Sequence, residues 1–429
     1  MKVHLRMLGC RLNQSEIDMM ARQFEQQGHT ITDNANEAQQ IIVNTCAVTN
    51  EASRSSRKLV RDLHRDNQSA EITVTGCYAQ IQPDAIAVID GVKRVVNNAE
   101  KSGIVTQITG VDIAPFDLEP HARDVRSAGF GARTRAFIKV QDGCDNSCTF
   151  CVTTVARGAG QSRNADEIIN EIQHLHQHLG YQEAVLTGVH LGSYGYDLGN
   201  HNGLLELVIR ILDETDIPRL RLSSLEPWDL AEGFFDLWQN KRLQPHLHLP
   251  LQSGCDSTLK RMRRNTSQTE FRALMQSARE KIPDVRITSD VIVGFPGETD
   301  EEWDISKAFI QEMGFDGLHA FRYSVREGTP ASRMRGQVRK AKKKARIHEL
   351  LAWASERETH FAEQYQGQTL PVLWEGVSGS SDAGYFQTGY THNYIRVQTV
   401  HPRVLSSLII PARINHVVDG VAQVTPVIE

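Results

Sequence analysis

The chain of 429 residues has few cysteines and no long apolar segment. Its seven cysteines are sparse and odd in number, which argues against a disulfide scaffold. No apolar run approaches the length that a membrane-spanning helix needs, and no apolar signal segment precedes the first predicted strand. We therefore expect a cytoplasmic protein without a membrane partner, whose reduced thiols are available to bind metal.

The chain also lacks an excess of positive charge. Lys and Arg total 47 against 52 Asp and Glu, which gives a formal net charge of −5. A nucleic-acid partner cannot be argued from that sum and must rest on local patches. Residues 339–346 carry six positive charges in a helix-favouring segment that runs on to about Tyr365, and residues 260–264 carry four more. Such runs are typical of solvated helix faces, but they also make phosphate contact plausible.

Three of the cysteines, Cys144, Cys148 and Cys151, lie within eight residues, directly after a predicted strand at 136–140. Three thiolates this close can hold three corners of a 4Fe–4S cluster and leave the fourth iron open. The alternative, a zinc site, usually shows paired C-x-x-C knuckles or nearby histidines, and neither flanks this segment.

The C-x-x-x-C-x-x-C spacing of this triad resembles that of the radical-SAM superfamily. The resemblance implies that S-adenosylmethionine (SAM) binds the open iron and is cleaved to a 5′-deoxyadenosyl radical. Phe150 is a candidate for contact with the adenine of SAM, and Gly188 for close approach of backbone to this cofactor. Their alternative roles are a loop aromatic that packs into the core and a tight turn between strand and helix.

Cys10, Cys46 and Cys77 each end a short apolar or β-branched run, and helix-like segments separate the three runs. That alternation predicts a parallel sheet in a β-α-β-α-β arrangement. Because ligands bind outside the carboxyl ends of such strands, we expect the three thiols to converge and to hold a second cluster. The alternative is three unrelated buried cysteines. Cys255 has no cysteine nearby and is predicted to be a buried or loop thiol.

The pattern along the chain predicts an α/β protein of three domains. Residues 1–107 form a doubly wound parallel-sheet domain, followed by a linker at 108–134. Six strand–helix units at 135–365 predict a partial (β/α)6 barrel that ends in the basic helix. Residues 366–429 have the alternating runs of a small all-β barrel, a fold that often binds RNA. The residues of this barrel predicted to be exposed are Tyr390, His392, Asn393, Tyr394 and Arg396.

Over essentially its whole length, the chain resembles the methylthiotransferases of the radical-SAM superfamily. The matching stretches are residues 8–14, 44–49, 76–80 and 292–298. The resemblance implies an amino-terminal cluster domain, a radical-SAM barrel and a carboxy-terminal TRAM domain that binds RNA. It also implies SAM and two 4Fe–4S clusters. The first cluster would be held by Cys144, Cys148 and Cys151. The second, which carries the transferred sulfur, would be held by Cys10, Cys46 and Cys77.

The resemblance further implies how the reaction proceeds and what it acts on. No catalytic residue is expected beyond the cluster ligands, and an electron donor such as flavodoxin or ferredoxin and a sulfur source are needed. Residues 44–52, 139–145 and 186–195 are similar to the enzymes that convert N6-threonylcarbamoyladenosine in tRNA, on the 3′ side of the anticodon, to its 2-methylthio derivative. The partner would then be the anticodon stem-loop of a tRNA. The alternatives are isopentenyladenosine in tRNA and an aspartate of a ribosomal protein.

Overall fold

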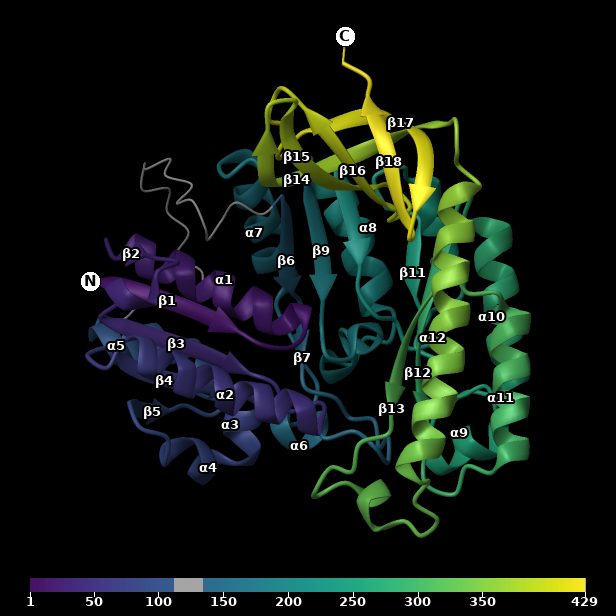
Figure 1. Cartoon of the computed structure of the whole chain (residues 1–429), viewed down its shortest axis with the longest axis horizontal. Coiled ribbons are helices and arrows are strands. Elements are labelled where there is room, and N and C mark those ends of the chain that lie inside the picture. Colours follow the sequence, from purple (N-terminus) through teal and green to yellow (C-terminus); the bar gives the residue numbers. More distant parts are fainter. Residues whose placement is uncertain (112–133, 429) are drawn as a thin grey trace.

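The computed structural model describes residues 1–111 and 134–428, which form three units in contact with one another (Figure 1). Of the predicted linker at 108–134, residues 112–133 lie outside the described part of the chain. Among the residues described, no helix combines the length and the apolar character needed to cross a membrane.

The amino-terminal unit is a five-stranded sheet in the order β2-β1-β3-β4-β5, with all pairs parallel. Its apolar residues form two clusters because they alternate between the two faces of the sheet. Helices α1 and α5 pack on one face, and α2, α3 and α4 pack on the other, as a doubly wound fold requires. The elements are β1 (Lys2–Met7), α1 (Arg11–Gln26), β2 (Thr30–Ile31), β3 (Gln40–Thr45), α2 (Asn50–Asp66), β4 (Glu71–Gly76), α3 (Cys77–Ile81), α4 (Pro83–Ala87), β5 (Val92–Val95) and α5 (Ile104–Thr109).

The central unit is a partial barrel of six parallel strands. The strands form two three-stranded sheets, β10-β9-β6 and β11-β12-β13, and isolated bridges between Leu220 and Leu243 and between Ser224 and His248 join them. The strands are β6 (Arg135–Lys139), β9 (Glu183–Thr187), β10 (Arg219–Leu222), β11 (His246–His248), β12 (Arg286–Val293) and β13 (Gly317–Arg322), and β7 (Gln141–Asp142) pairs with β8 (Gln161–Ser162) beside them.

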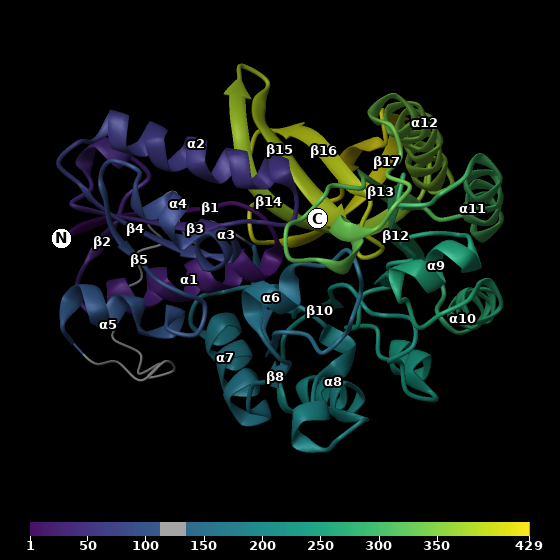
Figure 2. The ribbon, with the colours of Figure 1, turned by 90° about the horizontal axis from the view of Figure 1, so that it is seen from below.

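Helices cover the outside of this partial barrel (Figure 2). One large apolar core lies between them and the strands. The predicted basic helix is present as α12, the last of the series. The helices are α6 (Thr153–Arg157), α7 (Ala165–Gln177), α8 (Gly203–Glu214), α9 (Asp256–Met262), α10 (Gln268–Lys281), α11 (Asp300–Met313) and α12 (Lys340–Glu363).

The carboxy-terminal unit is a closed barrel of five strands in the order β14-β15-β16-β18-β17. This confirms the predicted all-β barrel. The strands are β14 (Thr369–Ser381), β15 (Gly384–Thr391), β16 (Arg396–His401), β17 (Ile409–Val418) and β18 (Val421–Pro426). The barrel covers the end of the partial barrel at which the strands begin, above β6, β9 and β11 in Figure 1.

The loop between β15 and β16 inserts into that end of the partial barrel, so the prediction of five exposed residues there was wrong for four of them. Asn393 is fully buried, and of the five only Arg396 is exposed. The Tyr394 ring stacks on His246 with 4.6 Å between ring centroids, and its hydroxyl accepts hydrogen bonds from Arg11 (3.0 Å) and Arg135 (2.8 Å). The local pattern could not reveal this burial because the covering residues come from the other two units.

Candidate functional site

The loop that carries Cys144, Cys148 and Cys151 lies between β7 and α6. Gly143 begins it with a φ of +70°, and a Cβ at this position would lie 1.8 Å from the carbonyl oxygen of Ala159. Only glycine fits such a turn. Burial raises the pKa of the Cys148 thiol to about 11, and it also raises the pKa of Cys151. These thiols are therefore protonated at neutral pH unless a metal ion compensates their charge.

Arg264 lies directly beside this triad. Its Nη1 is 3.7 Å from the Cys148 sulfur, and its Nη2 donates to the carbonyl oxygen of Pro250 at 2.7 Å and to Glu226 at 2.5 Å. The guanidinium also lies 4.4 Å from the centre of the Trp228 ring. The sequence placed Arg264 in a basic patch for phosphate, but the structure buries it behind the triad. Nothing in the local sequence signals this position.

A second polar group flanks Cys144. His190 Nε2 is 2.5 Å from Asp229 Oδ2, and its ring is 3.3 Å from the amide nitrogen of Asn146. Burial lowers the pKa of His190, but hydrogen bonds to Asp229 and Cys144 outweigh this and raise it to about 10. The imidazolium therefore adds a positive charge where cysteine thiolates are predicted. Sequence analysis treated this stretch as a subfamily feature and missed the role of the histidine.

The structure brings Cys10, Cys46 and Cys77 to one edge of the amino-terminal sheet, as the strand ends predict. Cys10 caps α1, Cys77 begins α3, and Cys46 follows β3. Gly76, before Cys77, has a φ of +98°, and an added Cβ would lie 2.4 Å from the backbone of Thr45. Burial, together with the charges of Cys77 and Cys10, raises the pKa of Cys46 to about 11. The three sulfurs are therefore close enough to interact electrostatically.

Both triads border one cavity of about 920 Å³. Five of the six cysteines line it, and Cys46 lies next to Gly9, which also lines it. Gly188 and Phe150 are on its wall too, and Phe150 packs in addition against the small apolar cluster around Phe295. The structure thus places the predicted ligands and SAM contacts around one space, and their roles stay predictions.

The spacing of the thiols bears on the choice between zinc and an iron–sulfur cluster. Four thiolates on one zinc ion lie about 3.8 Å apart, given bonds of about 2.3 Å. Among the described residues, one group of three His, Cys, Asp or Glu side chains has all its ligand atoms within 4.8 Å of one another. This group is His248, Asp290 and His319. Neither cysteine triad is that compact, so both suit a cluster better than a single ion.

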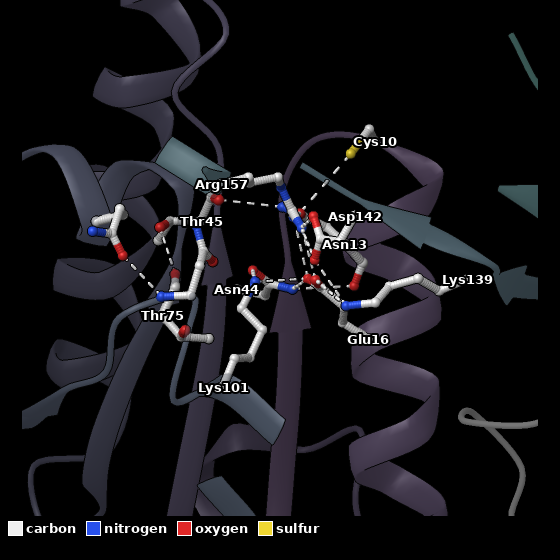
Figure 3. Close-up of polar contacts among 12 residues, drawn as sticks. Cys10, Asn13, Glu16, Asn44, Thr45, Thr75, Lys101, Lys139, Asp142 and Arg157 are labelled. Atoms are coloured by element: carbon white, nitrogen blue, oxygen red, sulfur yellow. Dashed lines mark hydrogen bonds and ion pairs between the residues drawn. The ribbon is translucent and has the colours of Figure 1, made fainter. Parts of the chain in front are cut away.

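A buried hydrogen-bonded network joins the two triads (Figure 3). Arg157, on α6 after Cys151, donates to Glu16 (2.9 Å), Asp142 (2.9 Å) and Asn13 (2.8 Å). Asn13 in turn donates to the carbonyl oxygens of Leu8 and Thr45, just before Cys10 and Cys46. The loops of the two triads are therefore connected through side chains. No motif in the sequence predicts this network.

On the other side of the network, Glu16 accepts from Lys101 at 2.7 Å and from Asn44 at 2.9 Å. Burial raises the pKa of this carboxyl, but Lys101 and Arg157 outweigh it and hold the pKa well below its usual range. Glu16 is therefore ionised in the interior of the protein, and these partners stabilise its charged form.

Known families match two parts of the chain. Residues 2–97 match the uncharacterized protein family UPF0004, and residues 138–309 match the radical SAM superfamily. The threonylcarbamoyladenosine tRNA methylthiotransferase MtaB of Bacillus subtilis is 37% identical over 91% of this chain and 88% of its own length. The enzyme of the same name from Thermotoga maritima is 36% identical over 94% and 92%. A tRNA-2-methylthio-N(6)-dimethylallyladenosine synthase from Acetivibrio thermocellus is 30% identical over 96% and 88%.

Solved structures show likeness in fold. The radical S-adenosylmethionine methyltransferase TsrM from Kitasatospora setae, with cobalamin and a [4Fe-4S] cluster bound, superposes with a TM-score of 0.57. The match covers 77% of each chain at 16% sequence identity. The fold of about three quarters of this chain is therefore one already seen in a solved structure.

Proposed function

The chain belongs to the methylthiotransferase family of radical-SAM enzymes, and we propose that it converts N6-threonylcarbamoyladenosine in tRNA, on the 3′ side of the anticodon, to the 2-methylthio derivative. The observation that carries this proposal is the single cavity bordered by both cysteine triads. Membership of the family implies SAM and a 4Fe–4S cluster as cofactors. The relatives with the higher identities are named for the threonylcarbamoyl substrate, which favours it over dimethylallyladenosine.

Two clusters fit the residues present. Cys144, Cys148 and Cys151 would hold the cluster that binds SAM, with Phe150 and Gly188 beside the cofactor. Cys10, Cys46 and Cys77 would hold the auxiliary cluster. When bound, these groups supply the 5′-deoxyadenosyl radical, the sulfur and, from a second SAM, the methyl group. In the product a methylthio group would stand in place of the hydrogen on adenine C2.

Side chains of the protein itself position the loops that carry the cysteines and place positive charge beside them. Arg264 and protonated His190 each present a positive charge to one cysteine of the SAM-binding triad, which stabilises thiolates there. Arg157 and Glu16 connect this loop to the amino-terminal unit, so the two triads keep a fixed separation. An external electron donor such as flavodoxin or ferredoxin and a sulfur source complete the proposal.

Deleting the gene is expected to remove 2-methylthio-N6-threonylcarbamoyladenosine from cellular tRNA. Wild-type protein should restore it, whereas Cys148→Ala should not, because the substitution removes a ligand of the SAM-binding cluster. The measurement is mass spectrometry of nucleosides from total tRNA. A normal nucleoside profile in the deletion strain would contradict the proposal. Loss of 2-methylthio-isopentenyladenosine instead would transfer the assignment to that substrate.

The basic start of α12 is the proposed contact for the tRNA backbone. Lys342 pairs with Asp300 at 2.7 Å and Arg346 is buried against Glu298, so these two charges are already used. Lys340 and Lys344 are exposed, and the described residues offer them no ion pair. They are therefore free to neutralise phosphates.

Replacing both Lys340 and Lys344 with glutamine should weaken tRNA binding and reduce its dependence on salt. Each lost phosphate contact lowers the slope of log K against log salt by about 0.7 to 0.9, so the double variant should lose about 1.5. Fluorescence anisotropy with an anticodon stem-loop across a salt series measures this. The control is Lys307→Gln, a lysine already paired with Glu349, which should keep the wild-type slope. An unchanged slope in the double variant would exclude this surface.

A further inference from the structure

The lumen wall formed by β11, β12 and β13 is mostly polar. Alternate residues of a strand face the same side, and the residues of these strands that line the cavity between the cysteine triads are His246, His248, Arg286, Thr288, Asp290, Gly317, His319 and Phe321. Of these only Phe321, nearest the end of β13, is apolar. Lumens of parallel barrels are filled mainly by branched apolar side chains. We call the first seven residues the polar wall.

The hydroxyl of Thr288 organises the middle of the polar wall. It lies 3.0 Å from His248 Nδ1, 3.2 Å from His246 Nε2 and 3.3 Å from the carbonyl oxygen of Leu247. A hydroxyl has one proton to donate and lone pairs that accept, so it bonds both imidazoles when it donates to His248 Nδ1 and accepts from His246 Nε2. His248 Nε2 then carries the proton of its ring.

The protonated nitrogen of His248 faces a carboxylate. His248 Nε2 is 3.4 Å from Asp290 Oδ1 and donates to it, which leaves the other lone pairs of that carboxylate for a ligand. Asp290 is also the direct register partner of His319 on β13. Burial lowers the pKa of His319, so its ring is neutral at neutral pH and offers one donor and one acceptor. A ligand with N–H and O–H groups would satisfy this arrangement.

Arg286 adds a positive charge to the polar wall. It uses its terminal nitrogens on the carbonyl oxygen of Tyr394 and on Glu358, and its Nε is buried away from the cavity. The polar wall therefore combines a carboxylate, a neutral imidazole and a fixed cation around the cavity. A ligand whose polar atoms match these groups gains hydrogen bonds that an apolar ligand cannot make.

We propose that the polar wall binds the threonylcarbamoyl substituent and selects it over a prenyl group. This inference rests on the proposed function and names the residues that read the substrate. The urea N–H and the hydroxyl of the substituent would donate to Asp290, and His319 would donate to one of its carbonyl or carboxylate oxygens. A dimethylallyl group has no hydrogen-bonding atom, so it could form none of these bonds. Sites built this way reject the analogue that lacks the polar groups.

The test compares three anticodon stem-loops on the reconstituted enzyme, with threonylcarbamoyladenosine, isopentenyladenosine or unmodified adenosine at the target position. Fluorescence anisotropy gives each affinity. The variants are His319→Leu and Asp290→Asn, and the control is His348→Leu, the same substitution at an exposed position of α12. We expect each variant to reduce the preference for threonylcarbamoyl RNA over unmodified RNA by about 10-fold, mostly as a higher Kd for the threonylcarbamoyl RNA. The control should keep the wild-type preference.

Equal weakening of all three RNAs in both variants would overturn the inference, because it would indicate a general structural role. The polar wall could also be occupied by a divalent cation, since His248, Asp290 and His319 have ligand atoms within 4.8 Å. One equivalent of zinc bound by the wild type but not by His319→Leu would equally overturn it.

The inference and the proposed function can fail separately. If the wild-type enzyme does not methylthiolate the threonylcarbamoyl stem-loop, the proposed function fails. If it does, and the variants keep the full preference for this RNA, only the inference fails.

Discussion

Cys77→Ala is expected to cleave SAM but to form no methylthiolated RNA, whereas Cys148→Ala should do neither. The two residues belong to different triads on one cavity, and only the triad in the partial barrel is predicted to bind SAM. Each variant should also hold about half of the iron of the wild-type protein, because each loses one of two clusters. Chromatography of 5′-deoxyadenosine formed with dithionite, mass spectrometry of the RNA and an iron assay measure the three quantities.

The seventh cysteine supplies the matched control for this experiment. Cys255 is buried at the start of α9 and contacts Ser257, away from both triads. Cys255→Ala should therefore keep full iron, SAM cleavage and product. Methylthiolated RNA from Cys77→Ala would contradict the auxiliary site, and full iron content in Cys148→Ala would contradict the first.

Arg157→Leu should destabilise the metal-free protein by about 3–5 kcal/mol, the usual cost of removing one partner from a buried ion pair. Its side chain is 2% exposed and is shared between Glu16 and Asp142, so leucine would leave two carboxylates with too few partners. The free energy of unfolding in urea measures the loss. Glu16→Gln combined with Arg157→Leu should cost less than the sum of the two single substitutions, because the same interaction is removed twice.

A surface arginine gives the reference for this loss. Arg65 at the end of α2 pairs with Asp62, but its side chain is 70% exposed. Arg65→Leu should change the free energy of unfolding by no more than about 0.5 kcal/mol. If Arg157→Leu costs as little as Arg65→Leu, the network in Figure 3 does not hold the two units together.

The order of the elements could be predicted from the sequence because each long strand has its own apolar run. The range 136–140 was predicted as a strand, and β6 spans Arg135–Lys139. Strands β2 and β5 were missed because they have only two and four residues, too few for a pattern to emerge.

The sequence predicted only those parts of the candidate site that follow from local patterns, such as the positions of strand ends. The rule that parallel strands end at one edge correctly brought Cys10, Cys46 and Cys77 together. It could not show that Arg157 would pair with Glu16, because 141 positions of the chain separate them. Nor could it show that the histidines of β11 share one hydroxyl of β12, since that depends on the register between the two strands.

The inserted loop between β15 and β16 limits how far the carboxy-terminal barrel can be treated as a separate module. Tyr394 belongs to that barrel, yet its hydroxyl is bonded by Arg11 of the amino-terminal unit and Arg135 of the central one. A chain truncated after residue 365 would lose the loop that closes one end of its lumen. A chimaera that carries the carboxy-terminal barrel of a relative would need a loop between β15 and β16 that packs against both the amino-terminal and the central unit. The three units can therefore diverge freely on their outer surfaces, but at this junction they must change in concert.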